Sequence, residues 1–415
     1  MTGDEPIENG VVALEDTRIV GVGPLAEFQD ELAGAPVEHF PEGTLLPGLI
    51  DAHAHLTLPA NRQSYERMAQ DSDELMALIS IRNLHRHLVS GVTTIRDNGC
   101  RNRVTFAVRE ALRRGYFSGP RLLLAGRPLT HRLGHFWWCN GEADDEAEIR
   151  AAVRQLVAEG ADHIKIMASG GGTAGTSPYH ASYTSEELRV AVETAHGLDR
   201  LTTAHCRARQ SMHFAVDAGL DCIEHAEFLV PSGHDRAAKG GMEYDARLTE
   251  RMLQAGTFVS FTFQAGGYAS LLELRQAPVP RGPERDELEA YFDAKRALFG
   301  QLLRDGMLPR LVISTDAGPG DTEFGHLEHG VQLAVESGMP CGQALAAVTR
   351  IAAEACGVGD MVGTLEPGKE ADLLVVGGNP LENIAALTKV QAVFVAGERV
   401  AESSVAAPRA RFSAA

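Results

Sequence analysis

The chain has 415 residues, of which 38 are basic and 56 acidic, so its formal net charge is −18. This balance argues against nucleic acid or an anionic membrane as the main partner, because both bind basic surfaces. No run of about 18 apolar residues predicts a membrane-spanning helix. The first residues carry acids at Asp4, Glu5 and Glu8, where a secretory signal would be basic. Six cysteines without regular spacing are typical of a reducing compartment, so we expect a cytoplasmic protein.

Both ends of the chain have the composition of β-strands. Short strands are predicted at 11–14, 18–23 and 37–40, separated by glycine and proline, and again at 371–378 and 390–400. Neither end alone has enough strands to enclose a core. We therefore expect residues 1–47 and 357–415 to form one composite β-sandwich domain.

Between residues 48 and 356, short apolar runs alternate with amphipathic helical segments. The eight strand candidates are 49–55, 92–97, 121–126, 163–169, 201–206, 221–226, 257–262 and 311–316. Eight strands, each followed by a helix, predict an α/β fold of the (β/α)₈ TIM barrel type. A doubly wound open sheet is the alternative, but an eightfold alternation is more typical of a closed barrel.

Barrel enzymes carry their reactive side chains at the C-terminal ends of the strands. At five of these ends the sequence has candidate metal ligands, which are His53, His55, Lys165, His205, His225 and Asp316. His53 and His55 are two residues apart on one strand, so their side chains point to the same side. His205 and His225 end neighbouring strands and would form a second cluster, while Asp316 would supply an oxygen ligand. Satisfied interior histidines are the alternative, but they do not explain the ordered occurrence of these residues at successive strand ends.

Lys165 lies within an apolar strand, where burial of an ammonium group is costly and lowers its pKa. A neutral amine at this position can react with carbon dioxide to give a carbamate, an anion that bridges two metals. The alternatives are a lysine that extends out of the barrel or one that pairs with an acid such as Asp162. The four histidines favour the bridging carbamate.

Five features together resemble the metal-dependent amidohydrolase superfamily, and the resemblance covers nearly the whole chain. They are LLPGLIDAHAHL (45–56), the strand-four lysine, the histidines of strands five and six, STDAG (314–318) and GTLEPGKEADLLVV (363–376). The resemblance implies a binuclear centre of two divalent metals, with zinc preferred. His53 and His55 would hold one metal, and His205 and His225 the other. Carbamylated Lys165 would bridge them, and Asp316 would bind metal and move a proton.

Within this superfamily the chain is most similar to the branch of prolidase-like dipeptidases, carboxypeptidases and relatives of imidazolonepropionase. The motifs that carry this similarity are HIKIMASGGG (163–172), TSEEL (184–188), AHCRA (204–208) and IEHAEFL (223–229). Two departures affect the expected substrate but not the metal centre. The Gly-Gly-His usual after strand three is Leu133-Gly134-His135, and Cys206-Arg207 follow His205 where small residues are usual.

The residues also predict a mechanism. Two divalent metals would lower the pKa of a bridging water to near neutrality, so that hydroxide attacks the carbonyl. Asp316 would take the proton of this water and deliver it to the leaving amine. His135 is our candidate donor to the developing oxyanion, with His131 as a weaker candidate. The alternative for His135 is a loop histidine packed against Trp137 or Trp138.

Three further residues are candidates for contact with substrate. Tyr179 and His180 end a glycine-rich loop, 169–180, which either reaches the substrate or is a mobile surface loop. Arg207 follows a metal ligand by two residues, and its guanidinium suits a carboxylate. The alternative for Arg207 is a structural pair with an acid. His326 and His329 are expected to be solvated or structural.

We therefore expect a hydrolase that cleaves an amide C–N bond, most favourably in dipeptides or N-acyl amino acids. Its partner would be a small-molecule amide that carries a carboxylate. A cyclic-amide, heterocycle, carbamate or urea-type xenobiotic hydrolase on the same centre is the alternative. A deaminase is disfavoured, because family deaminases usually keep one metal and lack the bridging lysine. The complete ligand set also disfavours a non-catalytic scaffold. The sequence leaves a homo-oligomer open.

Overall fold

Eight parallel strands form a closed barrel in the computed structural model, which describes residues 6–28, 34–233, 240–278 and 281–400. The strands are β4 (Leu49–Ala54), β5 (Val92–Asp97), β6 (Arg121–Leu124), β7 (His163–Ile166), β8 (Leu201–Ala208), β9 (Cys222–Val230), β11 (Phe258–Thr262) and β12 (Leu311–Ser314). They form two sheets, β4-β5-β6 and β7-β8-β9-β11-β12. Parallel bridges between Leu129 and Ile166, and between Ala54 and Ala317, join the two sheets into one barrel. The predicted TIM barrel is confirmed, and the open sheet is excluded.

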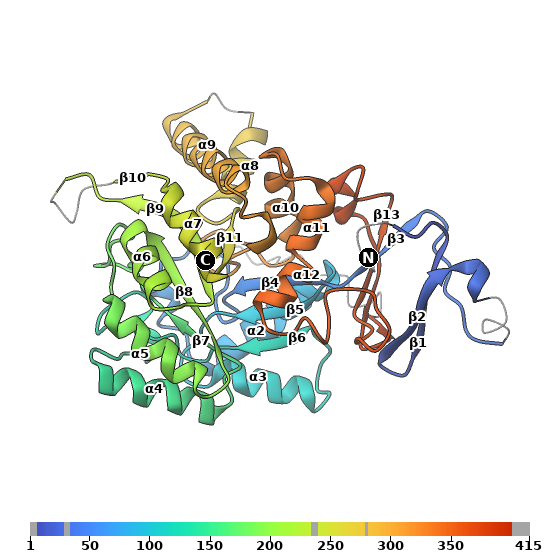
Figure 1. Ribbon diagram of the computed structural model, residues 1–415, viewed down its shortest axis with the longest axis horizontal. Helices are drawn as coiled ribbons and strands as arrows, with labels where there is room; N and C mark the ends of the chain where they lie inside the picture. Colours follow the sequence, from blue (N-terminus) through green and yellow to red (C-terminus); the bar gives the residue numbers. More distant parts are fainter. Residues whose placement is uncertain (1–5, 29–33, 234–239, 279–280, 401–415) are drawn as a thin grey trace.

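Helices follow the strands and surround the barrel (Figure 1). Their bounds are α1 (Tyr65–Met68), α2 (Asp73–Val89), α3 (Val104–Arg113), α4 (Glu146–Glu159), α5 (Ser185–His196), α6 (Arg209–Asp217), α7 (Ala246–Ala255), α8 (Tyr268–Gln276), α9 (Pro283–Arg304), α10 (Leu327–Glu336), α11 (Cys341–Ala347) and α12 (Arg350–Ala355). The TSEEL motif opens α5 because Thr184 and Glu187 form a reciprocal capping box. Among the described residues, no helix has both the length and the apolar character needed to span a membrane.

Strands from the two ends of the chain pair beside the barrel (Figure 1). The first of these sheets has the order β15 (Glu398–Arg399), β14 (Val390–Val395), β13 (Leu373–Gly377) and β3 (Gly43–Pro47). A hairpin of β1 (Gly10–Glu15) and β2 (Arg18–Pro24) packs against it through a small core that contains Ile19, Val375 and Phe394. The short β10 (Gly241–Met242) instead pairs with β9 of the barrel. The division into domains 1–47 with 357–415, and 48–356, stays a prediction.

One expected strand is absent from the described residues. The segment 37–40 has no strand pairing, and β3 begins only at Gly43. Pro36 and Pro41 flank this segment, and proline has no backbone N–H to offer to a sheet. Phe40 still packs against the small core of the terminal strands. The strand predicted at 37–40 is therefore wrong.

The terminal sheet contacts the base of the barrel through Leu374. This side chain is fully buried and lies directly over Gly91, where α2 ends and β5 begins. Gly91 has a φ of +94°, and a Cβ atom there would lie 2.8 Å from the Leu374 methyl carbons. Both the backbone conformation and the close approach therefore require glycine at position 91.

We expect Leu374→Ala to lower the free energy of unfolding by about 2–5 kcal/mol, because it leaves a cavity between the sheet and the barrel. Val20→Ala is the matched control, since Val20 lies on β2 with half its surface exposed. Urea titration followed by circular dichroism measures both changes. Equal stability of Leu374→Ala and Val20→Ala would contradict the proposed role of this contact.

Candidate metal centre

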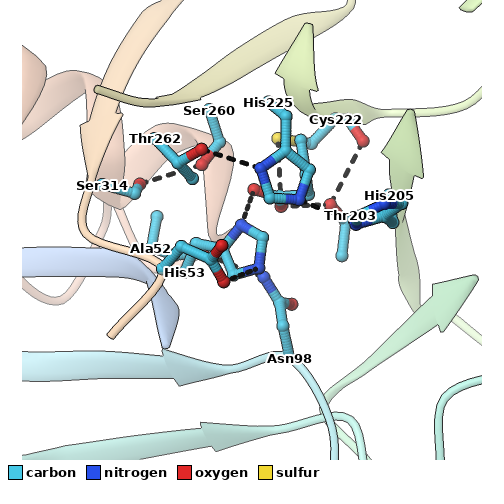
Figure 2. A network of polar contacts seen from close by, with 12 residues as sticks. Ala52, His53, Asn98, Thr203, His205, Cys222, His225, Ser260, Thr262 and Ser314 are labelled. Carbon is cyan, nitrogen blue, oxygen red and sulfur yellow. Dashed lines mark hydrogen bonds and ion pairs between the residues drawn. The ribbon is translucent and has the colours of Figure 1, made fainter. Parts of the chain in front are cut away.

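The predicted ligands lie together at the C-terminal end of the barrel. His53 lies near the end of β4 and His55 directly after it, while Lys165, His205 and His225 lie on β7, β8 and β9, and Asp316 follows β12. Figure 2 shows the imidazoles of His53, His205 and His225 facing one another across the barrel. The barrel closure itself brings Asp316 to His53, because the Asp316 N–H donates a 2.8 Å hydrogen bond to the His53 carbonyl.

His53, His55 and Asp316 form the first group of ligand atoms. The two Nε2 atoms are 3.3 Å apart, and Asp316 Oδ1 lies 3.4 Å from the first and 3.5 Å from the second. Ligands placed tetrahedrally around zinc at about 2.0–2.1 Å are themselves about 3.3–3.4 Å apart. The triangle therefore has the dimensions of one face of a zinc site.

His205 and His225 form the second group. His205 Nδ1 lies 2.8 Å from His225 Nε2, and the His225 ring centroid is 4.9 Å from that of His53. The two groups are therefore adjacent. His225 and Asp316 both have positive φ, at 69° and 57°. Such strained backbone in residues other than glycine gathers at functional sites.

Outer contacts orient three of the imidazoles. His53 Nδ1 is 2.8 Å from a Glu224 carboxylate oxygen, and His205 Nε2 donates to the Gly170 carbonyl at 3.1 Å. His225 Nδ1 is hydrogen-bonded to the Thr262 hydroxyl at 2.7 Å (Figure 2). Such partners fix the tautomer of metal-binding histidines. With a proton on each outer nitrogen, the inner lone pairs would face one another, and a shared cation would stabilise this arrangement.

Lys165 is fully buried, and its Nζ has no hydrogen-bond partner among the described residues. Burial lowers the pKa of Lys165, against the opposing effect of Glu224 and Asp316. Neither alternative raised for this lysine matches the geometry. It does not extend into solvent, and Asp162 instead pairs with Arg109. A buried, unpaired amine fits the expected attachment of a carbamate.

His135 lies beside the second group, with its ring centroid 4.6 Å from that of His205. The Phe136 N–H donates to the Thr173 hydroxyl, and the same hydroxyl is hydrogen-bonded to His135 Nδ1 at 2.8 Å. Burial lowers the pKa of His135 to about 3, and the charges of Arg207 and Lys165 add to this effect. His135 is therefore neutral at pH 7.

The packing of His135 differs from the alternative on Trp137 or Trp138. Its ring contacts among the described residues are with Tyr65, Phe136 and His205. Gly171 lies so close that a Cβ atom there would be 2.4 Å from His135 Nε2. The weaker candidate, His131, stacks on Tyr183 and pairs with Asp144.

Arg207 lies at the rim of the centre, but its guanidinium already forms an ion pair with the carboxylate of Glu227. Its Nε and Nη2 atoms lie 2.8 and 2.7 Å from one oxygen of Glu227, and its side chain is 24% exposed. The buried Glu227 also accepts a hydrogen bond from Tyr291 at 2.9 Å and lies 3.7 Å from Lys295 Nζ. The structural pair considered for Arg207 is therefore present.

Tyr179 and His180 lie apart from the ligand groups. They line a separate cavity of about 660 Å³ together with Arg209, His213 and Glu243, and none of the six predicted ligands lines it. The nearer part of the same loop does reach the centre, through Gly170 and Thr173.

Two residues important to this geometry, Glu224 and Arg96, do not stand out in the sequence. Both are buried, and Arg96 Nη2 lies 2.8 Å from the Glu224 carboxylate. Alternation along a strand assigns Glu224 and His225 to opposite faces. The left-handed backbone of His225 breaks this alternation. The signal that could have identified them in the sequence is the presence of a basic and an acidic residue, respectively, on two predicted barrel strands, β5 and β9.

Comparison with known proteins identifies the family. The model of the amidohydrolase family matches residues 44–400. The chain belongs to the amidohydrolase family. The recognition made from the motifs is confirmed, and the chain is a hydrolase acting on C–N bonds. Amidohydrolases generally bind divalent metals, and the His53, His55 and Asp316 group is a candidate for this role.

Three similar proteins illustrate the range of this amidohydrolase's relatives. The ochratoxinase of Aspergillus niger is 26% identical over 423 residues, covering 94% of this chain and 82% of the relative. The imidazolonepropionase of Geobacillus kaustophilus is 26% identical over 398 residues, covering 89% of this chain and 84% of the relative. The crystal structure of an Xaa-Pro dipeptidase with bound methionine is 26% identical with a TM-score of 0.75, and the match covers 94% of both chains.

We predict that Glu224→Gln lowers metal affinity about 10- to 100-fold, the usual effect of removing an outer partner of a ligand histidine. The neutral amide of glutamine would replace the anionic carboxylate that accepts from His53 Nδ1, so the ring would be held less firmly. Glu227→Gln is the matched control, because it also breaks a buried ion pair but has no histidine contact among the described residues. Competition with a chelator measures the affinity. An equal loss in both variants would assign the effect to general destabilisation.

Proposed function

We propose that this amidohydrolase is a binuclear metal-dependent hydrolase that cleaves the amide bond of a dipeptide or an N-acyl amino acid. The observation that carries the proposal is the pair of adjacent ligand groups with the unpaired amine of Lys165 buried at the same centre. The similarity to a dipeptidase structure supports the peptide-like substrate.

His53 and His55 would hold one divalent metal, His205 and His225 the other, with zinc as the preferred ion. The buried Lys165 amine would attack carbon dioxide, forming an N–C bond and releasing a proton, and the resulting carbamate would bridge the pair. When bound, two such metals lower the pKa of a shared water and polarise a substrate carbonyl.

Asp316 is the proposed proton carrier. Burial raises the pKa of its carboxyl group, against the opposing effect of His53 and Lys165. A raised pKa brings a carboxylate closer to the range in which it both accepts and returns a proton near neutral pH. Asp316 would take the proton of the attacking water and transfer it to the nitrogen of the leaving amine.

Neutral His135 is the proposed donor to the developing oxyanion. The Thr173 hydroxyl is hydrogen-bonded to Nδ1, and in the tautomer in which Thr173 donates, the Nε2 proton would be left for the substrate oxygen. A fixed donor at such a position contributes a few kcal/mol to the stability of the transition state. Tyr179 and His180 would contact substrate only through its more distant parts, because they line the separate cavity.

A second candidate is hydrolysis of a neutral cyclic amide, heterocycle, carbamate or urea. The Arg207–Glu227 pair favours it, because the guanidinium is partly neutralised before any substrate binds. A screen of metal-loaded protein against dipeptides, N-acyl amino acids, lactams and carbamates separates the two candidates. Turnover confined to neutral substrates would overturn the peptide-like proposal.

The cellular location and the domain division of this amidohydrolase are also proposals. We propose a cytoplasmic location, which the six free cysteines support. We also propose the composite β domain of 1–47 and 357–415 beside the catalytic barrel of 48–356, supported by the pairing of β3 with β13. A homo-oligomer stays open.

We expect Asp316→Asn to reduce kcat by about 10²-fold or more, the usual scale for an acid–base group, while most of the metal is retained. An amide has nearly the same shape as the carboxylate but does not take up the proton. Steady-state measurement of kcat, together with metal analysis of the same sample, provides the test. Near-normal turnover would move the base role to another residue, and His225 would be examined first.

For substrates with a free carboxylate, Arg207→Met should raise KM about 10- to 150-fold, which corresponds to the 1.5–3 kcal/mol of a hydrogen bond to a charged group. The corresponding carboxamides should be poor substrates already and change little. Arg209→Met is the matched control, because Arg209 pairs with Glu243 in the separate cavity. An unchanged KM for the acids in Arg207→Met would show that Arg207 only balances Glu227.

A further inference from the structure

A second cluster of metal-binding side chains lies outside the six-residue centre. His326, Glu328 and His329 place one ligand atom each within 4.8 Å of one another. His326 is the N-cap of α10, and His329 lies in the first turn of this helix. The residues follow β12 and the loop that begins after Asp316, so they belong to the same end of the barrel as the predicted ligands.

The helix supplies the spacing that a metal needs. Residues three apart on a helix are neighbours on its surface. The rings of His326 and His329 are accordingly stacked, with centroids 4.9 Å apart and planes inclined by 8°. Glu328 Oε1 lies 2.9 Å from His326 Nδ1 and 3.8 Å from His329 Nε2. These distances bracket the separation of about 3.3–3.4 Å between tetrahedral ligands of zinc.

The two histidines of the cluster, His326 and His329, line a cavity of about 340 Å³. The acids that line this cavity are Asp321, whose carboxylate accepts hydrogen bonds from Ser270, together with Glu323 and Glu273. Glu323 lies 3.9 Å from His326 Nε2. The cationic side chain that lines the cavity, Arg62, is paired with Glu273. The cavity therefore has room for an ion with water ligands and an excess of negative charge near it.

We propose that His326, Glu328 and His329 form a peripheral site for a divalent transition metal of the zinc class, separate from the centre formed by the strand-end residues. Two imidazoles and one carboxylate are the donor set that zinc accepts, with water completing the coordination. A bound ion would hold all three side chains together at the N-terminus of α10, whereas the hydrogen bond between His326 and Glu328 joins only two of them. This proposal does not depend on the reaction catalysed at the barrel mouth.

The test counts zinc in the full-length protein after equilibration with Zn²⁺ and removal of excess ion. We expect the double variant His326→Gln/His329→Gln to bind one equivalent fewer per chain than the wild type. The matched control is His196→Gln/His213→Gln, which removes two partly exposed helical histidines that also pair with acids. The control should retain the wild-type stoichiometry. Equal zinc content in the wild type and the first double variant would overturn the proposal.

Cobalt provides a readout that does not depend on activity. With Co²⁺ in place of Zn²⁺, the difference spectrum between wild type and His326→Gln/His329→Gln should contain the absorption of one site with nitrogen and oxygen ligands. If circular dichroism shows that the double variant is not folded, Glu328→Gln replaces it. That single variant should weaken the affinity for one equivalent at least tenfold, and an unchanged affinity would overturn the proposal.

Discussion

The seam between β4 and the segment after β12 holds the geometry of the candidate centre. The Asp316 N–H donates to the His53 carbonyl, and the His55 N–H donates to the Ala317 carbonyl. The buried carboxylate of Asp51 also accepts a hydrogen bond from the His53 backbone. Because a closed barrel fixes its strand register, these bonds set the spacing of the first ligand group before any side-chain rotamer is chosen. The ligand triangle is therefore a property of the barrel backbone.

Strand β9 supplies two buried carboxylates that face different parts of the centre. Glu224 lies between Arg96 and His53 in the barrel interior, while Glu227 holds Arg207 at the rim. Buried ion pairs add little net stability, because desolvation offsets most of the attraction between the charges. Their clearest contribution is orientation, since each carboxylate holds one side chain in place. The left-handed backbone at His225 lies between the two acids.

The sequence predicts the barrel because its strands and helices follow from local patterns, and the structure brings the candidate ligands together, while their role as ligands stays a prediction. Short apolar runs show where each strand ends. A histidine at the C-terminal end of a barrel strand is then expected at the mouth of the barrel. The environment of Arg207 could not be derived in this way, since its partner Glu227 comes from the neighbouring strand. The proline-flanked segment 37–40 shows the opposite limit, because its residues suggested a short strand but its backbone has no sheet partner.

The pairing of the two chain ends has a consequence for synthesis on the ribosome. The Thr44 hydroxyl donates to the Gly378 carbonyl across 334 residues of sequence. Strand β3 leaves the ribosome early, but its partner β13 is made only after all eight barrel strands. Throughout translation β3 therefore exposes an unpaired edge to solvent and to neighbouring nascent chains. This sheet can therefore be completed only after all the barrel strands have been synthesised.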